Sequence, residues 1–434
     1  MALPARKPAT PLNELTATEM AAAIAAGEAT SEAVVRACIE RIVAREPQVL
    51  AWQYFNAEQA LAQARAHDSS GRRGALGGVP FGIKDIIDTS DMPTEMGSPI
   101  YAGHRPRADA ACVALSRKAG GILMGKTVTT EFANRHPGKT RNPHDPARTP
   151  GGSSSGSAAA VADFMVPLAI GTQTTGSTIR PASYCGVFGY RPTYGDIRCV
   201  GVKEASGSLD TVGLIARSVE DIALYRDVLV GGEPEPLPAK VPAPRIGFCR
   251  THFWSRIEPG TQQQLEEAAR RLARAGAQVK DVELPREFES MEDVHLRISS
   301  YEFARNFTWE IENHWESISE TLRNNRLKHG LACTFERYRE ARDLAERCRL
   351  LLAPLFEEHD VLLTAAAAGE APVGLNLTGD ASFCLIWTTT HVPCVTLPVF
   401  RGPHGLPIGA QLIGRRNGDR ALFSAANWVY RALD

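Results

Sequence analysis

The chain has 434 residues, of which 44% are hydrophobic and 22% charged, an ordinary composition for a globular protein. Its 48 Lys and Arg residues nearly cancel its 49 Asp and Glu residues, which argues against a nucleic-acid-binding or membrane-surface protein. The length suffices for a large buried core, and it is compatible with one large α/β unit as well as with about three domains of average size.

Nine cysteines are scattered along the chain without a Cys-x-x-Cys pair. An odd number of scattered cysteines is typical neither of a disulfide framework nor of a zinc site, and it favours reduced thiols in a cytoplasmic protein. Residues 1–14 are polar and contain proline, so they lack the apolar core of a signal peptide. No charge-free apolar stretch reaches the roughly 20 residues of a membrane span, so no membrane association is expected.

The first 70 residues are predicted to form helices that pack on the rest of the chain. Thr16 and Glu19 have the spacing of a capping box, which marks the start of a helix. Thr30 or Ser31 can cap a second helix, whose apolar residues recur on one face. The expected helical segments are 20–26, 34–42 and 57–67.

Strands and helices alternate from residue 78 to residue 230. In chain order we expect a strand with a loop over 78–87, a helix over 108–118, a short buried strand over 122–124, a helix over 157–162, an interior strand over 166–170 and a helix from Ser218 through Leu229.

Residues 231–244 are rich in Pro and Gly, which is typical of a linker and equally of a surface loop within one domain. A mostly helical region is expected over 290–356. The other expected elements are strands over 245–249, 361–364, 392–398 and 408–413, and helices over 262–275 and 420–433. Because strands alternate with helices throughout, the chain is predicted to have a layered α/β core.

Two short segments of small polar residues lie in the middle of the chain. Residues 151–157 read Gly-Gly-Ser-Ser-Ser-Gly-Ser, and residues 171–177 read Gly-Thr-Gln-Thr-Thr-Gly-Ser. Alone, the first segment is as consistent with a flexible linker as with a site, but it opens directly onto an apolar stretch typical of a buried helix. A phosphate-binding loop is disfavoured because no Gly-Lys-Ser/Thr follows.

The second segment is consistent with a plain polar turn, and also with an exposed nucleophile at Ser177. Small residues ahead of a serine let successive backbone N–H groups point at one spot, where they stabilise the oxyanion of an acyl-transfer intermediate. A buried strand, a tight turn and then a serine is the arrangement that exposes a nucleophile.

Lys84 is surrounded in the sequence by apolar residues between Val79 and Ile87. A lone lysine is most often a solvated surface residue. In an apolar setting, however, burial lowers the pKa of the amine, and a neutral amine is a usable base near pH 7. Because neither serine segment contains a histidine, the pattern indicates serine hydrolysis with a lysine as the base.

These segments resemble the amidase signature family of serine hydrolases, and the resemblance covers nearly the whole chain. It extends from Gly78-Val79-Pro80 to residues 409–414, which read Gly-Ala-Gln-Leu-Ile-Gly. The central motif runs from Pro150 through residues 180–182 (Arg-Pro-Ala) to residues 185–193 (Cys-Gly-Val-Phe-Gly-Tyr-Arg-Pro-Thr). Its two key serines lie 24 residues apart, as the family pattern requires.

The resemblance implies a Ser–Ser–Lys triad in which Ser177 is the nucleophile, Ser153 the bridging serine and Lys84 the base. It also implies a cis peptide bond between Gly152 and Ser153. Neutral Lys84 would draw a proton from Ser153, which draws one from Ser177 as that serine attacks the amide carbonyl.

The same resemblance implies an oxyanion hole made by the backbone N–H groups of Thr174, Thr175, Gly176 and Ser177. The relayed proton would reach the leaving nitrogen through Ser153, after which water hydrolyses the acyl-enzyme by the same route. This chemistry needs neither a metal nor an organic cofactor, and none is expected.

Two positions depart from the commonest family wording, Gly-Thr-Asp-x-Gly-Gly-Ser. Gln173 stands where that wording has Asp, and Thr175 stands at the first Gly of the pair. Thr175 carries a Cβ and resists positive φ, so the oxyanion loop is expected to be slightly reshaped. The departures concern rate and substrate fit more than the reaction class.

The glutamine and the arginine at position 180 resemble the branch that contains malonamidase-like enzymes. In that branch an arginine three places after the nucleophile is associated with the carboxylate of a small acid amide, which suits a guanidinium. An internal salt bridge of Arg180 is an equally good interpretation. The predicted substrate-binding residues are Arg180, Thr172 and Gln173.

Other candidate residues carry less information. Glu131 matches a family segment near the active site, but a buried and paired carboxylate is the favoured interpretation. Cys185 is expected to be a packing residue. The scattered histidines, expected mostly on the surface or in loops and without metal-binding spacing, are His104, His136, His144, His391 and His404.

The resulting prediction is one domain over 1–434 with a three-layer α/β/α sandwich around a large mixed β-sheet, the amidase signature fold. Within it, N-terminal helices over 1–70 pack on a catalytic core over 78–230. The helical region over 290–356 supplies pocket walls.

The predicted function is hydrolysis of the carbon–nitrogen bond of a small amide, a carboxylated amide first and a neutral aliphatic or aryl amide second. Two alternatives stay open. One is the amidase subunit of a tRNA-dependent amidotransferase, against which the missing Asp-x-Gly-Gly counts. The other is a catalytically silent binding protein, against which the complete triad counts. Expected partners are a small-molecule amide and, by family habit, a second copy in a homodimer, with no nucleic acid and no membrane.

Overall fold

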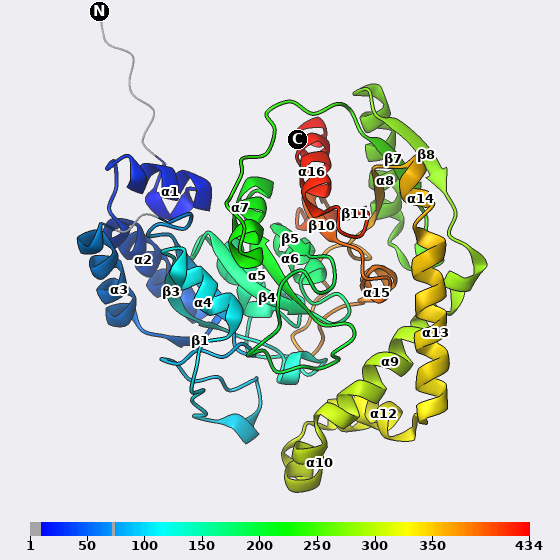
Figure 1. Ribbon diagram of the computed structural model, residues 1–434, viewed down its shortest axis with the longest axis horizontal. Helices are drawn as coiled ribbons and strands as arrows, with labels where there is room; N and C mark the ends of the chain where they lie inside the picture. Colours follow the sequence, from blue (N-terminus) through cyan, green and yellow to red (C-terminus); the bar gives the residue numbers. More distant parts are fainter. Residues whose placement is uncertain (1–9, 72–73) are drawn as a thin grey trace, which may run out of the picture.

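One large mixed β-sheet forms the centre of the protein (Figure 1). The structure is a computed structural model that describes residues 10–71 and 74–434. Its strands are β1 (Trp52–Phe55), β2 (Pro80–Lys84), β3 (Ile122–Thr127), β4 (Leu168–Gln173), β5 (Phe188–Arg191), β6 (Thr211–Ala216), β7 (Arg245–Cys249), β8 (Gln278–Val282), β9 (Val361–Ala365), β10 (Cys394–Arg401) and β11 (Pro407–Gly414). These 11 strands of the described residues lie in the order β1-β3-β2-β4-β6-β5-β10-β11-β9-β7-β8.

The sheet combines parallel and antiparallel pairs. Strand β2 pairs in parallel with β3 and β4, and β7 pairs in parallel with β8 and β9. The central strands β4, β6, β5, β10, β11 and β9 pair antiparallel with one another. The prediction of an α/β fold around a large mixed sheet is confirmed.

Helices cover both faces of the sheet because the central strands are apolar on both sides. In β4, Ala169 joins one hydrophobic cluster, while its neighbours Leu168 and Ile170 join the other. On the Ala169 side lie α2 (Ser31–Val49), α3 (Ala57–Ser70), α5 (Ser155–Ala162) and α6 (Ile179–Cys185). On the opposite side lie α1 (Ala17–Ala25), α4 (Ala111–Lys118), α7 (Val219–Val230), α8 (Pro259–Arg274) and α16 (Asp419–Leu433).

The N-terminal helices begin where the sequence predicts. The Thr16 hydroxyl accepts from the Glu19 N–H, and the Glu19 carboxylate accepts from the Thr16 N–H, which completes the capping box of α1. Thr30 caps α2 through the N–H of Ala33. The first 70 residues are nevertheless not all helical, because β1 pairs antiparallel with β3 at the edge of the sheet. Residues 1–9 lie outside the described part of the chain.

The predicted helical region over 290–356 is confirmed and lies to one side of the sheet (Figure 1). Its helices are α9 (Met291–Asn306), α10 (Thr308–His314), α11 (Glu320–Leu322), α12 (Lys328–Ala332), α13 (Phe335–Leu352) and α14 (Leu355–Glu358), with a π-helical turn over Arg323–Leu327. The Pro- and Gly-rich segment over 231–244 joins two parts of this one sheet without a strand or helix of its own.

Several elements escape prediction from the sequence. Strand β5 has only four residues, and β8 is an edge strand with exposed polar residues, so neither shows a clear alternation. Helix α15 (Ser382–Thr389) is buried on every side and therefore lacks a polar face. Strand β6 and helix α6 likewise have no counterpart among the expected elements. Within the described residues, no helix is both long enough and apolar enough to cross a bilayer.

One glycine of the first serine segment, Gly156, is required by close packing. A Cβ at Gly156 would come within 2.2 Å of the Ala51 carbonyl oxygen and 2.3 Å of the Val128 nitrogen. Both neighbours are backbone atoms of the β1–β3 edge of the sheet, so they cannot move aside. The start of α5 can lie this close to the sheet only because residue 156 has no side chain.

We predict that Gly156→Ala lowers the free energy of unfolding by about 3 kcal/mol or more, because an overpacked backbone contact has no room to relax. Gly260→Ala in α8 is the matched control, since no atom lies within 4 Å of its added Cβ. The control should leave stability unchanged or raise it by up to about 1 kcal/mol. Denaturant unfolding of both variants checks this, and equal midpoints would contradict the packing argument.

Candidate active site

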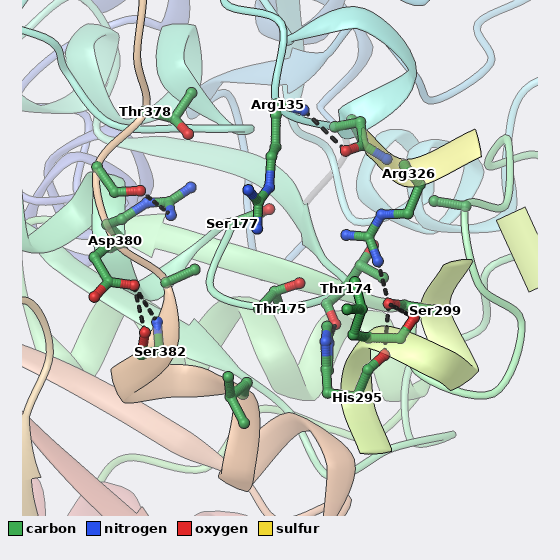
Figure 2. Close-up of a pocket in the computed structure, with 18 of the residues that line it drawn as sticks. Arg135, Thr174, Thr175, Ser177, His295, Ser299, Arg326, Thr378, Asp380 and Ser382 are labelled. Carbon is green, nitrogen blue, oxygen red and sulfur yellow. Dashed lines mark hydrogen bonds between the residues drawn. The ribbon is translucent and has the colours of Figure 1, made fainter. Parts of the chain in front are cut away.

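A pocket of about 550 Å³ lies beside the second serine segment, where the helical region meets the sheet (Figure 2). This volume is in the range of sites for small molecules. Its wall includes Ser177 together with residues from three other places in the chain: the loop after β3, helix α9 and the segment leading into α15.

Lys84 ends strand β2 and is completely buried. Its Nζ lies 2.6 Å from Ser153 Oγ and 2.7 Å from Thr172 Oγ1. Burial holds the pKa of this amine well below its usual value, and the more distant Asp210 carboxylate only partly opposes that effect. A lysine with hydroxyl neighbours and such a low pKa can act as a base.

A backbone hydrogen bond connects the loop that contains Ser153 to the segment that contains Ser177. The peptide bond between Gly152 and Ser153 is cis, as the family resemblance implies. The N–H of Ser154 donates to the Ser177 carbonyl at 3.1 Å, so the loop before α5 lies directly against the second serine segment. The structure thus places Lys84 against Ser153, and the residue after Ser153 against Ser177, of which Ser177 lines the pocket. The catalytic roles of the three residues remain a prediction.

The residues expected to form the oxyanion hole lie on this loop between β4 and α6. Thr174 and Thr175 line the pocket with Ser177. Thr175 is not among the residues with positive φ, so the expected strain from its Cβ does not arise. A Cβ at Gly176 would lie 3.1 Å from both the Cβ and the Sγ of Cys384, so the loop packs closely against α15 at that point.

Arg180 lines the pocket, but backbone carbonyls occupy its guanidinium. Its Nη1 donates to the Gly379 oxygen at 2.8 Å, and its Nη2 donates to the Gly152 oxygen at 2.5 Å. Burial lowers the pKa of this arginine. Among the described residues it forms no salt bridge, so the interpretation as an internal ion pair does not hold. Its contacts instead fix the peptide that precedes Ser153.

Thr172 and Gln173, predicted to contact substrate, do not line the pocket. The Thr172 hydroxyl contacts Lys84. The Gln173 Oε1 accepts from the backbone N–H groups of Thr178 and Ile179, at 2.9 and 3.1 Å, and its Nε2 donates to Thr388 Oγ1 at 3.2 Å. Both side chains therefore contact residues around the pocket without lining it.

The structure adds pocket residues that no sequence motif indicates. His295 lies on α9, and its Nε2 donates to the Thr174 carbonyl oxygen at 3.0 Å. Figure 2 shows Arg135 extending toward Ser177, Arg326 at one side of the pocket and Asp380 at the other. Arg135 follows the segment around Glu131, which matches a family segment. His295, Arg326 and Asp380 lie in regions without recognisable motifs.

The charges of the pocket wall are mostly positive. Burial lowers the pKa of Arg326 to about 10, so this guanidinium stays charged at neutral pH. Burial lowers the pKa of His295 to about 4, so its imidazole is neutral there. Of the wall's carboxylates, Glu292 forms an ion pair with Arg256 at 2.6 Å, and Asp380 accepts from the N–H of Ser382.

The weaker sequence candidates have mixed outcomes. Cys185 is fully buried, as expected of a packing residue. Glu131 is buried, but its partner is the backbone N–H of Ser319 rather than a charged group. His391 lies in the turn after α15, as a loop histidine would, and it is buried there against Ser208 and Arg349. Among the described residues, no cluster of His, Cys, Asp and Glu could hold a metal ion.

Comparison with known proteins gives consistent matches over the full chain. The Amidase family profile matches residues 33–423. A glutamyl-tRNA(Gln) amidotransferase subunit of Chloroflexus aggregans is 34% identical over an alignment of 480 residues that covers 98% of each protein. Among solved structures, an amidase superposes with a TM-score of 0.88 at 29% identity, covering 97% of this chain and all of its own. The peptide amidase of Stenotrophomonas maltophilia superposes with 0.82 at 28% identity, covering 98% of each chain.

The fold and these matches define an enzyme that hydrolyses amide bonds. The chain belongs to the Amidase family, the amidase signature family that its sequence resembles.

The prediction of small-molecule partners alone, without nucleic acid, is contradicted. Relatives that span nearly the whole chain are named as one subunit of a glutamyl-tRNA(Gln) amidotransferase. The prediction rested on a net charge of −1, which averages over the entire chain. Such an average cannot exclude a protein that works beside other subunits with a tRNA substrate.

We predict that Lys84→Met raises the free energy of unfolding above that of the wild type. This difference should be largest at the low-pH end of the range between the folded and unfolded pKa values of Lys84. The folded pKa of Lys84 lies far below the unfolded value of about 10.4, so the unfolded chain binds an extra proton between these two values. Wild-type stability therefore rises with pH across that window, and the relative stability of the variant should fall across it.

Chemical denaturation from neutral pH to about pH 10 measures this difference. Lys118→Met, at an exposed lysine of α4, controls for the loss of a lysine as such. A Lys84→Met stability difference that is flat with pH would contradict a depressed pKa at Lys84.

Proposed function

We propose that this chain is the amide-hydrolysing subunit of a tRNA-dependent amidotransferase, and that it releases ammonia from a small amide carrying a carboxylate. The contact that carries the chemical part of the proposal is that between the buried Lys84 amine and Ser153 Oγ, at 2.6 Å. The similarity to the Chloroflexus aggregans amidotransferase protein over 98% of both chains supports the amidotransferase setting.

The proposed reaction uses the Ser–Ser–Lys relay. Neutral Lys84 accepts the proton of Ser153 as Ser153 accepts that of Ser177, and Ser177 Oγ attacks the amide carbon. The proton passes back through Ser153 to the leaving nitrogen, which departs as ammonia. Water then attacks the acyl-enzyme by the same relay and frees the carboxylic acid. The attack by Ser177 and the later attack by water each begin with an uncharged Lys84, which its burial supports.

The pocket wall supports a carboxylated substrate, although not through the arginine that the sequence suggests. Arg180 already donates to two carbonyl groups. The Arg135 side chain is exposed, extends toward Ser177 and has no hydrogen-bond partner among the described residues (Figure 2). Arg326 lines the same pocket, is half-buried, and uses Nη1 to donate to Ser299 Oγ. We assign the substrate carboxylate to these two guanidinium groups.

Asp380 supports an amino-acid amide over a simple acid amide. It reaches the pocket from the side opposite Arg326 (Figure 2), and its Oδ1 accepts from the N–H of Ser382. A carboxylate there suits the ammonium group of a substrate whose carboxylate lies near Arg326. Glutamine carries both charged groups and a primary amide, and it is therefore the first substrate to test.

The second candidate is an amidase that works without partner subunits, with malonamate or a neutral amide as substrate. The observations that favour it are Gln173 and Thr175, which depart from the Asp-x-Gly-Gly wording expected of the amidotransferase protein. Solved relatives named simply as an amidase and a peptide amidase favour it as well. Membership of the malonamidase-like branch, a homodimer and a cytoplasmic location remain predictions from the sequence.

We predict that the purified chain releases ammonia from glutamine, and that Ser177→Ala lowers this rate by about 10³-fold or more because the nucleophile is lost. Ammonia release is measured for glutamine, malonamate and propionamide with both proteins. Isolation of the tagged chain from its native cells at low salt shows whether further subunits and tRNA accompany it. A chain that is isolated alone and prefers malonamate or propionamide would contradict the amidotransferase assignment and favour the second candidate.

We predict that Arg135→Gln and Arg326→Gln each raise KM for a carboxylated amide by about 10- to 100-fold, the usual effect of losing a hydrogen bond to a charged group. Arg323→Gln is the matched control, because this arginine lies one turn away, pairs with the exposed Glu316 and does not line the pocket. Kinetics with propionamide check the specificity, since a neutral amide has no carboxylate to lose. An equal loss for both amides would show that the arginines do not recognise the carboxylate.

A further inference from the structure

Two side chains from the C-terminal half of the chain hold the carbonyl groups of the serine loop. The His295 Nε2 donates to the Thr174 carbonyl oxygen at 3.0 Å, and the Thr388 hydroxyl donates to the Thr175 carbonyl oxygen at 2.7 Å. His295 belongs to α9 and Thr388 to α15, so each bond ties the loop to a different helix. Both tethers are buried.

These carbonyl groups belong to the peptide units that carry the proposed oxyanion donors. The Thr174 carbonyl shares a peptide plane with the N–H of Thr175, and the Thr175 carbonyl shares one with the N–H of Gly176. A trans peptide is rigid and directs its C=O and N–H to opposite sides. A side chain that donates to the carbonyl oxygen on one side of the peptide therefore directs the N–H to the opposite side.

The backbone N–H groups of this loop are unpaired among the described residues. Within the described residues, no hydrogen bond leads from the backbone N–H of Thr174, Thr175, Gly176 or Ser177 to another group. Thr174, Thr175 and Ser177 line the pocket, so these donors lie at its wall. Polarisation of the peptide by a hydrogen bond at its carbonyl also strengthens its N–H as a donor.

Gln173 sets the direction of the Thr388 hydroxyl. Its Nε2 donates to Thr388 Oγ1 at 3.2 Å, so that hydroxyl uses its own proton for the Thr175 carbonyl. Its Oε1 accepts from the N–H groups of Thr178 and Ile179, just after the loop. An aspartate at this position could only accept hydrogen bonds and could not donate to Thr388. The glutamine thus supplies a donor to Thr388 that the aspartate of the commonest family wording could not supply.

The tautomer of His295 follows from its partner. A carbonyl oxygen only accepts, so Nε2 must carry the proton. Arg326 donates to Ser299 Oγ, and Ser299 Oγ donates to the His295 carbonyl at 2.6 Å, which fixes this turn of α9 against the pocket. Asp210 adds a third tether by accepting from the Thr174 hydroxyl at 2.5 Å.

We propose that Thr388, oriented by Gln173, and His295 are positioning residues that aim the backbone N–H groups of Gly176 and Thr175 at the oxyanion. This inference rests on the proposed serine chemistry and goes beyond it by assigning roles to residues outside the triad and the pocket arginines. The donors themselves are backbone groups, which substitution cannot remove, so the side chains that hold the loop provide the means to test them.

The first test compares Thr388→Val with Thr388→Ser. Valine keeps the shape and removes the hydroxyl, and serine keeps the hydroxyl and removes a methyl group. We expect Thr388→Val to lower kcat about tenfold with KM nearly unchanged, less than the 10²- to 10³-fold loss of a direct oxyanion donor. Thr388→Ser should restore most of kcat. The rate at which a fluorophosphonate probe labels Ser177 should fall and recover in parallel, since its phosphonyl oxygen occupies the same hole.

Two further variants extend the test. Gln173→Glu keeps the size and the acceptor of the side chain but removes the donor to Thr388, and it should lower kcat in the same direction. His295→Leu removes the second tether and should also lower kcat with little change in KM. Denaturation midpoints of all variants report whether a loss comes from unfolding instead.

The outcomes separate this proposal from the proposed function. Normal kcat and labelling in Thr388→Val, or a loss that Thr388→Ser does not restore, would overturn the positioning role while leaving the serine chemistry intact. A wild-type protein that neither hydrolyses amides nor reacts with the probe would overturn the proposed function, and the positioning role with it. A loss of kcat that Thr388→Ser restores, at constant KM and stability, supports the proposal.

Discussion

The site depends on one constraint, the burial of a lysine amine without a counter-ion. Lys84 contacts two hydroxyl groups, and no carboxylate forms an ion pair with it in the described residues. Lys126, on the neighbouring strand, is equally buried but lies 3.2 Å from Asp85 and donates to the Ile87 carbonyl. The two lysines show the difference between a charge paired with a carboxylate and an amine suited to the proposed proton transfer.

The loop that carries Ser177 is fixed from several directions by distant parts of the chain. Thr388 and His295 hold its carbonyl groups, and Arg180 holds the peptide before Ser153. Donors that are fixed in advance need little reorganisation when charge develops on a substrate, and these tethers suit the oxyanion role that we propose for the loop. The helical region over 290–356 therefore supplies more than pocket walls, since it also carries part of the loop's support.

The surroundings of Ser177 and the curated relatives are both compatible with the proposed function. Positive groups on one side of the pocket and Asp380 on the other fit a small amide with two opposite charges (Figure 2). Curated relatives that match over nearly the full length are named as a subunit of an amidotransferase, and solved relatives of similar coverage are named as an amidase and a peptide amidase. A small charged amide as the source of ammonia is compatible with both.

The sequence by itself determined the fold class, the capped N-terminal helices and the residues of the proposed triad, because periodicity, capping boxes and a long contiguous motif are local properties. Tertiary structure decided how each pocket arginine is engaged. Arg180 donates to the carbonyls of Gly152 and Gly379, Arg326 donates to Ser299, and the Arg135 side chain has no hydrogen-bond partner among the described residues. Tertiary structure also joined Gln173 to Thr388, 215 residues apart. No pattern along the chain encodes such contacts, since they arise only when α9 and α15 pack beside the sheet.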